Sequence, residues 1–234
     1  MRIAISGTAN TGKSTFVKDF LKKWPTYSTP KTTYRDVLSD VGDEHSSNTT
    51  KKTQKKILDY QIKELKKYGE NDNVIFDRCP LDNLIYSMWA MEKSVGGIDE
   101  AFIDKCIPRV CESMRDIDII FLVPLTDASP IEIVDDNFRD TDETYIKEVD
   151  NIFKALMARY MHRAFEPFFP EDDVPAIIEI FGSPRERIYL ANMYIDADGD
   201  AMDGDVDGLI ADEVKHLMDE QKGKAAADGE LFIP

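Results

Sequence analysis

The 234-residue sequence predicts an α/β fold with a parallel sheet, and three observations lead to this prediction. Short apolar runs, typical of buried strands, alternate with stretches whose apolar residues recur at helical spacing. The run Ile117–Pro124 is apolar throughout, as in a central parallel strand that is covered on both faces. The run Ile3–Ile5 leads into a loop bounded by glycines and then into a helix. Strands that alternate with helices in this way favour a parallel sheet.

The loop after the first strand matches the pattern G-x-x-x-x-G-K-[ST]. Gly7, Gly12, Lys13 and Ser14 fill its four defined positions. The glycines let backbone N–H groups point at phosphates, and the helix that begins at Lys13 adds its positive N-terminal end. Lys13 is expected to reach the β- and γ-phosphates, and the Ser14 hydroxyl to bind Mg²⁺. The motif leaves open whether phosphate is transferred, hydrolysed or only bound. The same site is expected to include Asn10, Thr11 and Thr15.

Composition and charge narrow the class of protein. Hydrophobic residues make up 42% of the chain, no apolar run is long enough to span a membrane, and no signal peptide is expected. Three cysteines do not suggest a disulfide scaffold, so we expect the cytoplasm, that of the host if the protein is viral. Residues 1–70 carry 14 Lys and Arg against 8 Asp and Glu, whereas residues 71–234 carry 15 against 37. This pattern argues against wrapping of long nucleic acid but allows a local DNA contact.

Polar residues follow a predicted second strand at Tyr27–Thr29. Ligands of parallel sheets lie beyond the carboxyl ends of strands. Lys31, Tyr34 and Arg35 are therefore candidates for binding an acceptor substrate, with ordinary loop or helix-surface residues as the alternative.

The segment Lys52–Tyr68 is predicted to be a helix, on which Gln54 and Gln61 share a face. An amide side chain can both donate to and accept from the edge of a base. Gln61 is therefore a candidate for contacting a base, although glutamines on helices are often simply solvated.

The short apolar run Asn73–Arg78 ends in Asp77 and Arg78. Beside the phosphate loop, Asp77 can hold a Mg²⁺-bound water or meet an acceptor hydroxyl, and Arg78 can pair with a phosphate. The alternative is a structural Asp–Arg pair. In the helix that follows, Asp82 lies in the first turn, where it either caps the helix or contacts substrate.

A helix at Ala101–Met114 contains Cys106 and Cys111, which are expected to be buried thiols. Arg139 lies in the polar, acidic stretch that precedes a long helix. A cation on a closing lid would balance charge during phosphoryl transfer and exclude water. A salt bridge with the neighbouring aspartates is the alternative.

A last strand is predicted at Ala176–Phe181, followed by a helix whose first turn carries Arg185 and Arg187. This helix begins at the edge of the sheet that holds the phosphate loop. An adenine is expected to lie there against the backbone and the plane of an arginine.

Together these motifs resemble the P-loop nucleoside and nucleotide kinases, in particular the branch of the ribosylnicotinamide kinase domain and related phage kinases. The resemblance spans about residues 1–195 and rests on GTANTGKS (7–14), FDRCPLDNLIY (76–86), DDNFR (135–139) and FGSPRER (181–187). It implies a three-layer fold with a parallel sheet of about five strands, ATP and Mg²⁺ at Lys13 and Ser14, and an acceptor near Asp77 and Arg78. The lid, at about residues 132–145, would carry Arg139.

The sequence departs from this family at one position. Many relatives carry an E-x-x-R arrangement after the second strand, whereas Thr32 stands three residues before Arg35 here. Either Asp77 or Asp82 takes over the carboxylate role, or the acceptor is a phosphate that needs cations.

The cations at positions 31, 35 and 78 slightly favour a (deoxy)nucleoside monophosphate over a free nucleoside. The resemblance adds hydroxymethyluracil in DNA as a third acceptor. A regulator that binds ATP without transferring phosphate is the competing class, and a homodimer is one of the oligomeric states that the sequence leaves open.

Residues 196–234 are expected to form an appendage of acidic linker, helix and flexible tail. The linker, DADGDAMDGDVDG (196–208), is similar to a Ca²⁺ loop, but the twelve-residue pattern fits from neither of two starting positions. From Asp203 the twelfth position is Val214, and from Asp196 the glycine position is Ala201. A solvated linker is therefore preferred over a Ca²⁺ site.

Overall fold

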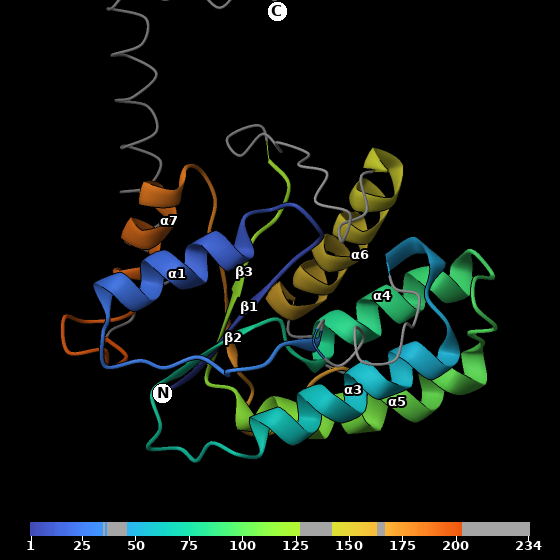
Figure 1. The fold of residues 1–234 in the computed structure, drawn as a ribbon, viewed down its shortest axis with the longest axis horizontal. Coiled ribbons are helices and arrows are strands. Elements are labelled where there is room, and N and C mark those ends of the chain that lie inside the picture. Colours follow the sequence, from blue (N-terminus) through green and yellow to red (C-terminus); the bar gives the residue numbers. More distant parts are fainter. Residues whose placement is uncertain (35, 37–45, 127–141, 163–166, 203–234) are drawn as a thin grey trace, which may run out of the picture.

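Four parallel strands form the centre of the fold in the computed structural model, which describes residues 1–34, 36, 46–126, 142–162 and 167–202 (Figure 1). The strands are β1 (Arg2–Ser6), β2 (Val74–Asp77), β3 (Ile119–Leu122) and β4 (Ala176–Glu179). Their order is β2-β1-β3-β4, and every neighbouring pair is parallel. The predicted α/β fold with a parallel sheet is confirmed, with four strands in the described part of the chain where about five were expected.

The predicted strand at Tyr27–Thr29 is reduced to a single parallel bridge between Ser28 and Val74. Ser28 donates its N–H to Asn73 O and accepts one from Ile75, both at 2.9 Å. In a parallel ladder the next donor on this strand would be residue 30, which is a proline and has no N–H. The pairing therefore stops after one residue, and β2 keeps an almost open edge.

Helices cover both faces of the sheet. The described α-helices are α1 (Lys13–Lys23), α3 (Lys51–Leu65), α4 (Pro80–Glu92), α5 (Glu100–Ser113), α6 (Glu143–Met161) and α7 (Pro184–Ala191). Short 3₁₀ turns occur at η1 (Ser46–Asn48) and η2 (Met114–Asp116). Figure 1 shows α1 and α7 on one side of the strands and α3 to α6 on the other, which gives the expected three layers.

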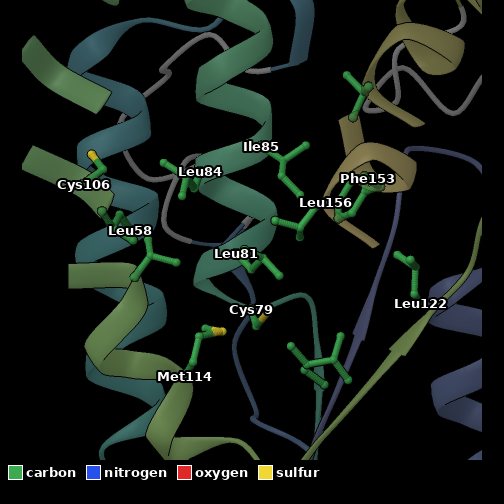
Figure 2. Close-up of a cluster of buried hydrophobic side chains, with 14 of the residues drawn as sticks. Leu58, Cys79, Leu81, Leu84, Ile85, Cys106, Met114, Leu122, Phe153 and Leu156 are labelled. Atoms are coloured by element: carbon green, nitrogen blue, oxygen red, sulfur yellow. The ribbon is translucent and has the colours of Figure 1, made fainter. Parts of the chain in front are cut away.

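Alternation along the strands divides the core between these two layers. On β1, Ala4 joins the cluster under α3 to α6, whereas Ile3 and Ile5 join the cluster under α1 and α7. Side chains of the larger cluster come from four helices, η2 and all four strands. Figure 2 shows part of it, with Leu58, Leu81, Leu84, Ile85, Cys106, Met114, Leu122, Phe153 and Leu156 among the labelled residues. Both sheet faces are therefore apolar, which leaves the strand ends for polar chemistry.

The acidic segment begins with a turn that packs against the end of α1. Trp24 Nε1 donates to Asp196 O and Tyr27 Oη donates to Gly199 O, both at 2.7 Å. The Asp196 carboxylate accepts the N–H groups of residues 198, 199 and 200. In the described ranges no group of three or more His, Cys, Asp or Glu side chains is arranged to hold a metal ion. Residues 203–234, with the rest of the linker and the predicted helix, lie outside the described part.

The expectation of buried thiols holds for Cys106 and only in part for Cys111. Cys79 and Cys106 are buried, Cys111 is half-buried, and all three are free thiols. No helix within the described residues has both the length and the hydropathy needed to cross a membrane.

Candidate active site

The phosphate loop connects β1 to α1 and depends on its two glycines. Gly7 has φ +136°, and a Cβ there would lie 2.6 Å from Val123 O at the end of β3. Gly12 has φ +77°, precedes the first residue of α1, and a Cβ there would lie 3.0 Å from Arg187 Nη1. Side chains at either position would be strained, because the loop passes directly over neighbouring backbone and the Arg187 guanidinium.

Lys13 lies across the inside of this loop. Its ammonium donates to Thr8 O and, at 3.1 Å, to Thr11 Oγ1. Thr11 Oγ1 also donates to Thr8 O at 3.1 Å. Thr8 Oγ1 in turn donates to Ile146 O in α6 at 2.8 Å, so α6 helps to hold the loop in shape. Of the other predicted loop residues, Asn10 has φ +60° and Thr15 is exposed on the first turn of α1.

Ser14 and Asp77 meet where α1 begins and β2 ends. The parallel register pairs Ile5 with Asp77, which brings the end of β2 beside the loop. Ser14 Oγ donates to Asp77 Oδ2 at 2.6 Å. A hydroxyl and a carboxylate oxygen are ligands that suit Mg²⁺, so this pair fits the ion that the sequence predicts.

Arg78 follows directly and has φ +80°, a strained conformation for a side chain other than glycine. Its Nη1 donates to Gly7 O at 3.1 Å and to Asp82 Oδ1 at 3.0 Å. The guanidinium carbon lies 4.9 Å from the centre of the Tyr86 ring and 5.9 Å from that of Tyr34. These contacts hold the cation at the end of β2, beside the loop.

Asp82 is only 1% exposed and lies behind Arg78. Besides Arg78, it accepts hydrogen bonds from Ser6 Oγ at 2.7 Å, Cys79 N at 3.1 Å and Gly7 N at 3.3 Å. Of its two expected roles, the helix cap is the one that this geometry gives it. Burial, followed by the charge of Asp82, raises the pKa of Cys79 to about 12.

A cavity of about 40 Å³ opens beside Asp77 and Arg78. Residues 29, 30 and 32–34 line it on one side, α3 on another, and the β2–α4 junction on a third. Gln61 lines this cavity, is 7% exposed, and its Oε1 has no hydrogen-bond partner among the described residues. Gln54, on the same face of α3, instead donates to Thr49 and accepts from Asn83.

The remaining predicted site residues differ in whether they are exposed, buried at the loop or outside the described part of the chain. Lys31 is exposed and does not line the cavity. Arg185 is exposed on α7, whereas Arg187 is 8% exposed and its Nη1 donates to Thr11 O. Arg35, Arg139 and the lid up to residue 141 lie outside the described residues.

Sequence reasoning missed two aromatic residues at this site. Tyr86 stacks on Arg78, and Tyr60 lines the cavity and donates its hydroxyl to Thr32 O. The signal for Tyr86 was its spacing, since it stands four residues after Asp82 and therefore on the same face of α4. The sequence held no comparable signal for Tyr60.

A parallel α/β sheet with a phosphate loop after β1, and with Ser14 and Asp77 paired at its mouth, defines the P-loop class of nucleotide-binding proteins. A family model described as an AAA domain matches residues 2–166. The match covers more than half of the chain, so the chain belongs to this family. No curated protein matches the sequence.

Solved structures confirm the expected resemblance at the level of the fold. A deoxyadenosine kinase from M. mycoides with bound dATP aligns with a TM-score of 0.58 and 19% identity, over 82% of this chain and 97% of that chain. NadR in complex with NR aligns with a TM-score of 0.57 and 13% identity, over 82% of this chain and 51% of that chain. A thymidylate kinase from Candida albicans aligns with a TM-score of 0.55 and 12% identity, over 82% of this chain and 89% of that chain. This chain therefore spans about half the length of NadR.

Proposed function

We propose that this protein transfers the γ-phosphoryl group of Mg·ATP to a nucleoside or nucleotide, with a (deoxy)nucleoside monophosphate slightly favoured. One observation carries the proposal. Asp77 accepts a hydrogen bond from Ser14 of the phosphate loop and also lines the cavity that holds Gln61 and Arg78. A donor site and an acceptor site that share one carboxylate suit transfer better than nucleotide binding alone.

The proposed roles follow from these positions. Mg²⁺ held by Ser14 and Asp77 would neutralise charge on the moving phosphoryl group. Lys13 would exchange its contacts with the loop for the β- and γ-phosphates. Asp77 would orient a Mg²⁺-bound water or the acceptor, and Arg139 would supply further positive charge from the lid.

The side chains that line the cavity indicate the class of the acceptor. Gln61 Oε1 is buried and lacks a donor within the described part of the chain, so a ligand with an N–H group at this point would satisfy it. The edge of a base carries such groups. Arg78, which lies against the rings of Tyr34 and Tyr86, would bind a phosphate on the same ligand. Among the structurally similar proteins, the deoxyadenosine kinase binds dATP and NadR binds NR, which supports a nucleoside or nucleotide as the ligand.

The test is ADP release from Mg·ATP, screened across nucleosides, their 5′-monophosphates and DNA that contains hydroxymethyluracil. We expect stimulation by one monophosphate, and Lys13→Ala or Arg139→Ala should abolish it while the arginine variant keeps its affinity for ATP. Stimulation by the modified DNA would move the acceptor to a base within DNA. ATP binding without stimulation by any acceptor would overturn the kinase proposal and favour a regulator.

A further inference from the structure

Arg187 is an arginine of α7 that lies behind the phosphate loop. Its side chain is 8% exposed, and Nη1 donates to Thr11 O at 2.5 Å. The same nitrogen would be 3.0 Å from a Cβ on Gly12, so the guanidinium packs directly on the loop backbone. So little exposed surface leaves no room for a base to stack on Arg187. Arg185, two residues earlier, is exposed.

The charge of Arg187 has no protein counterion in the described ranges. No carboxylate there forms an ion pair with it, and its Nε has no hydrogen-bond partner among the same residues. Burial lowers the pKa of Arg187, yet a guanidinium stays charged in proteins. A buried charge without a partner is costly. Arg2 shows the usual solution, because it is equally buried and pairs with Asp118 at 2.8 Å.

The contact with Thr11 also fixes the direction of an N–H group. In a planar trans peptide the C=O of one residue and the N–H of the next point in opposite directions. Arg187 draws Thr11 O toward α7, and the N–H of Gly12 must therefore point away from α7. The same reasoning applies at the other end of the loop, where Arg78 holds Gly7 O and so directs the N–H of Thr8.

We propose that Arg187 is a positioning residue of the phosphate loop: it orients the Gly12 N–H toward a bound phosphate chain, whose negative charge balances the buried guanidinium. This inference rests on the proposed binding of a nucleotide by the loop. It assigns Arg187 to the phosphates and removes it from the recognition of adenine. The contribution of Arg187 to binding is accordingly independent of the base.

The test compares a ligand that has a base with one that has none. Calorimetry measures the dissociation constants of Mg·ATP and of Mg²⁺ with inorganic tripolyphosphate, for the wild type, Arg187→Met and Arg187→Lys. We expect Arg187→Met to raise the dissociation constants of both ligands by the same factor, about tenfold or more. Arg187→Lys should recover part of the loss for both, because the ammonium keeps the charge and can still reach one acceptor.

The matched control is Arg2→Met, which removes an equally buried arginine far from the loop. It should lower the thermal midpoint and leave both dissociation constants unchanged. Equal binding of tripolyphosphate by the wild type and Arg187→Met would overturn the inference, as would a loss confined to ATP. If Arg187→Met does not fold, Arg187→Lys decides by the same comparison. A wild type that binds neither ligand would overturn the proposed function itself.

Discussion

Gln61 and Gln54 show how two identical side chains on one helix face acquire different roles. Gln54 is 4% exposed, and both atoms of its amide group are hydrogen-bonded, Nε2 to Thr49 and Oε1 to Asn83. Gln61 is similarly buried, but its Oε1 faces no donor in the described part of the protein. An amide that lines a cavity with an unused acceptor is available to a ligand.

Replacement of each glutamine by leucine should therefore have opposite consequences. Gln61→Leu should raise the KM for the acceptor about tenfold or more, with little change in the KM for ATP, because one hydrogen bond to the ligand is lost. Its free energy of unfolding should change little, since none of the described residues donates a hydrogen bond to Gln61 Oε1.

Gln54→Leu is the matched control. It should lower the free energy of unfolding by about 1–3 kcal/mol, because Thr49 and Asn83 lose buried partners. Steady-state kinetics and urea unfolding of both variants test this pair. An acceptor KM that stays constant in Gln61→Leu would contradict the role of this side chain.

At the residue scale, the sequence predicted the loop residues and Asp77 because their spacing carries a mechanism. It did not separate Gln61 from Gln54, since that difference depends on partners in other elements. Asp82 was left between cap and substrate contact for the same reason. The hydrogen bond from Cys79 N makes the cap evident, and the contacts with Ser6 and Gly7 show that the rest of the carboxylate faces the phosphate loop.

The phosphate loop and the end of β3 are in close contact at Gly7. Val123 O lies where a side chain at residue 7 would begin. The loop can therefore keep its path over β3 only if residue 7 is glycine.

Gly7→Ala should lower the free energy of unfolding by about 2–4 kcal/mol and remove measurable binding of ATP, because either the loop or β3 must move. Gly97→Ala is the control, since Gly97 also has positive φ but open space around it. Gly97→Ala should lower the free energy of unfolding by about 1 kcal/mol and leave the binding of ATP unchanged. Equal effects of the two substitutions in thermal unfolding would show that the contact with Val123 is unimportant.

Element boundaries were predicted closely where periodicity is strong. The helix predicted at Lys52–Tyr68 is α3, Lys51–Leu65, and the run Ile117–Pro124 contains β3. The segment Tyr27–Thr29 has the apolar and β-branched character of a strand, but Pro30 removes the donor that would extend the ladder. Local character predicted the strand, and a missing N–H two residues away limited it.

Across the whole molecule, stability should depend on pH through groups that are buried in the neutral form. Burial and the charge of Asp82 raise the pKa of Cys79 from 9.0 to about 12. Burial also raises the pKa of Tyr86 to about 12 and raises that of Tyr27. The unfolded chain releases these protons first, so stability is complete below the ordinary pKa values and is lost as the pH rises through the folded ones.

Urea unfolding should therefore show a falling free energy above about pH 9, by up to about 1.4 kcal/mol per pH unit for each such group. Cys79→Ala should flatten this dependence between about pH 9 and pH 10, below the usual range of tyrosine. Cys111→Ala, which removes a half-buried thiol, should flatten it less. Parallel curves for the wild type and Cys79→Ala would contradict this assignment.

The class and layering of the whole fold were predictable, because the alternation of strands and helices has few solutions. The strand order β2-β1-β3-β4 was not, since it depends on pairings between segments far apart in the chain. The packing of residues 196–199 on Trp24 and Tyr27 was equally hidden, because backbone carbonyls supply the acceptors and leave no pattern of side chains.

The single bridge at Ser28 has a consequence for how such a protein can evolve. Residues 29, 30 and 32–34, which line the cavity beside Asp77, follow this single backbone bridge, whereas the phosphate loop is fixed by β1, β3, α6 and α7. Substitutions or insertions in this segment can reshape the cavity without disturbing the loop. If the protein is the kinase that we propose, a change of preferred acceptor is therefore separable, in mutational terms, from the loop that would bind the phosphate donor.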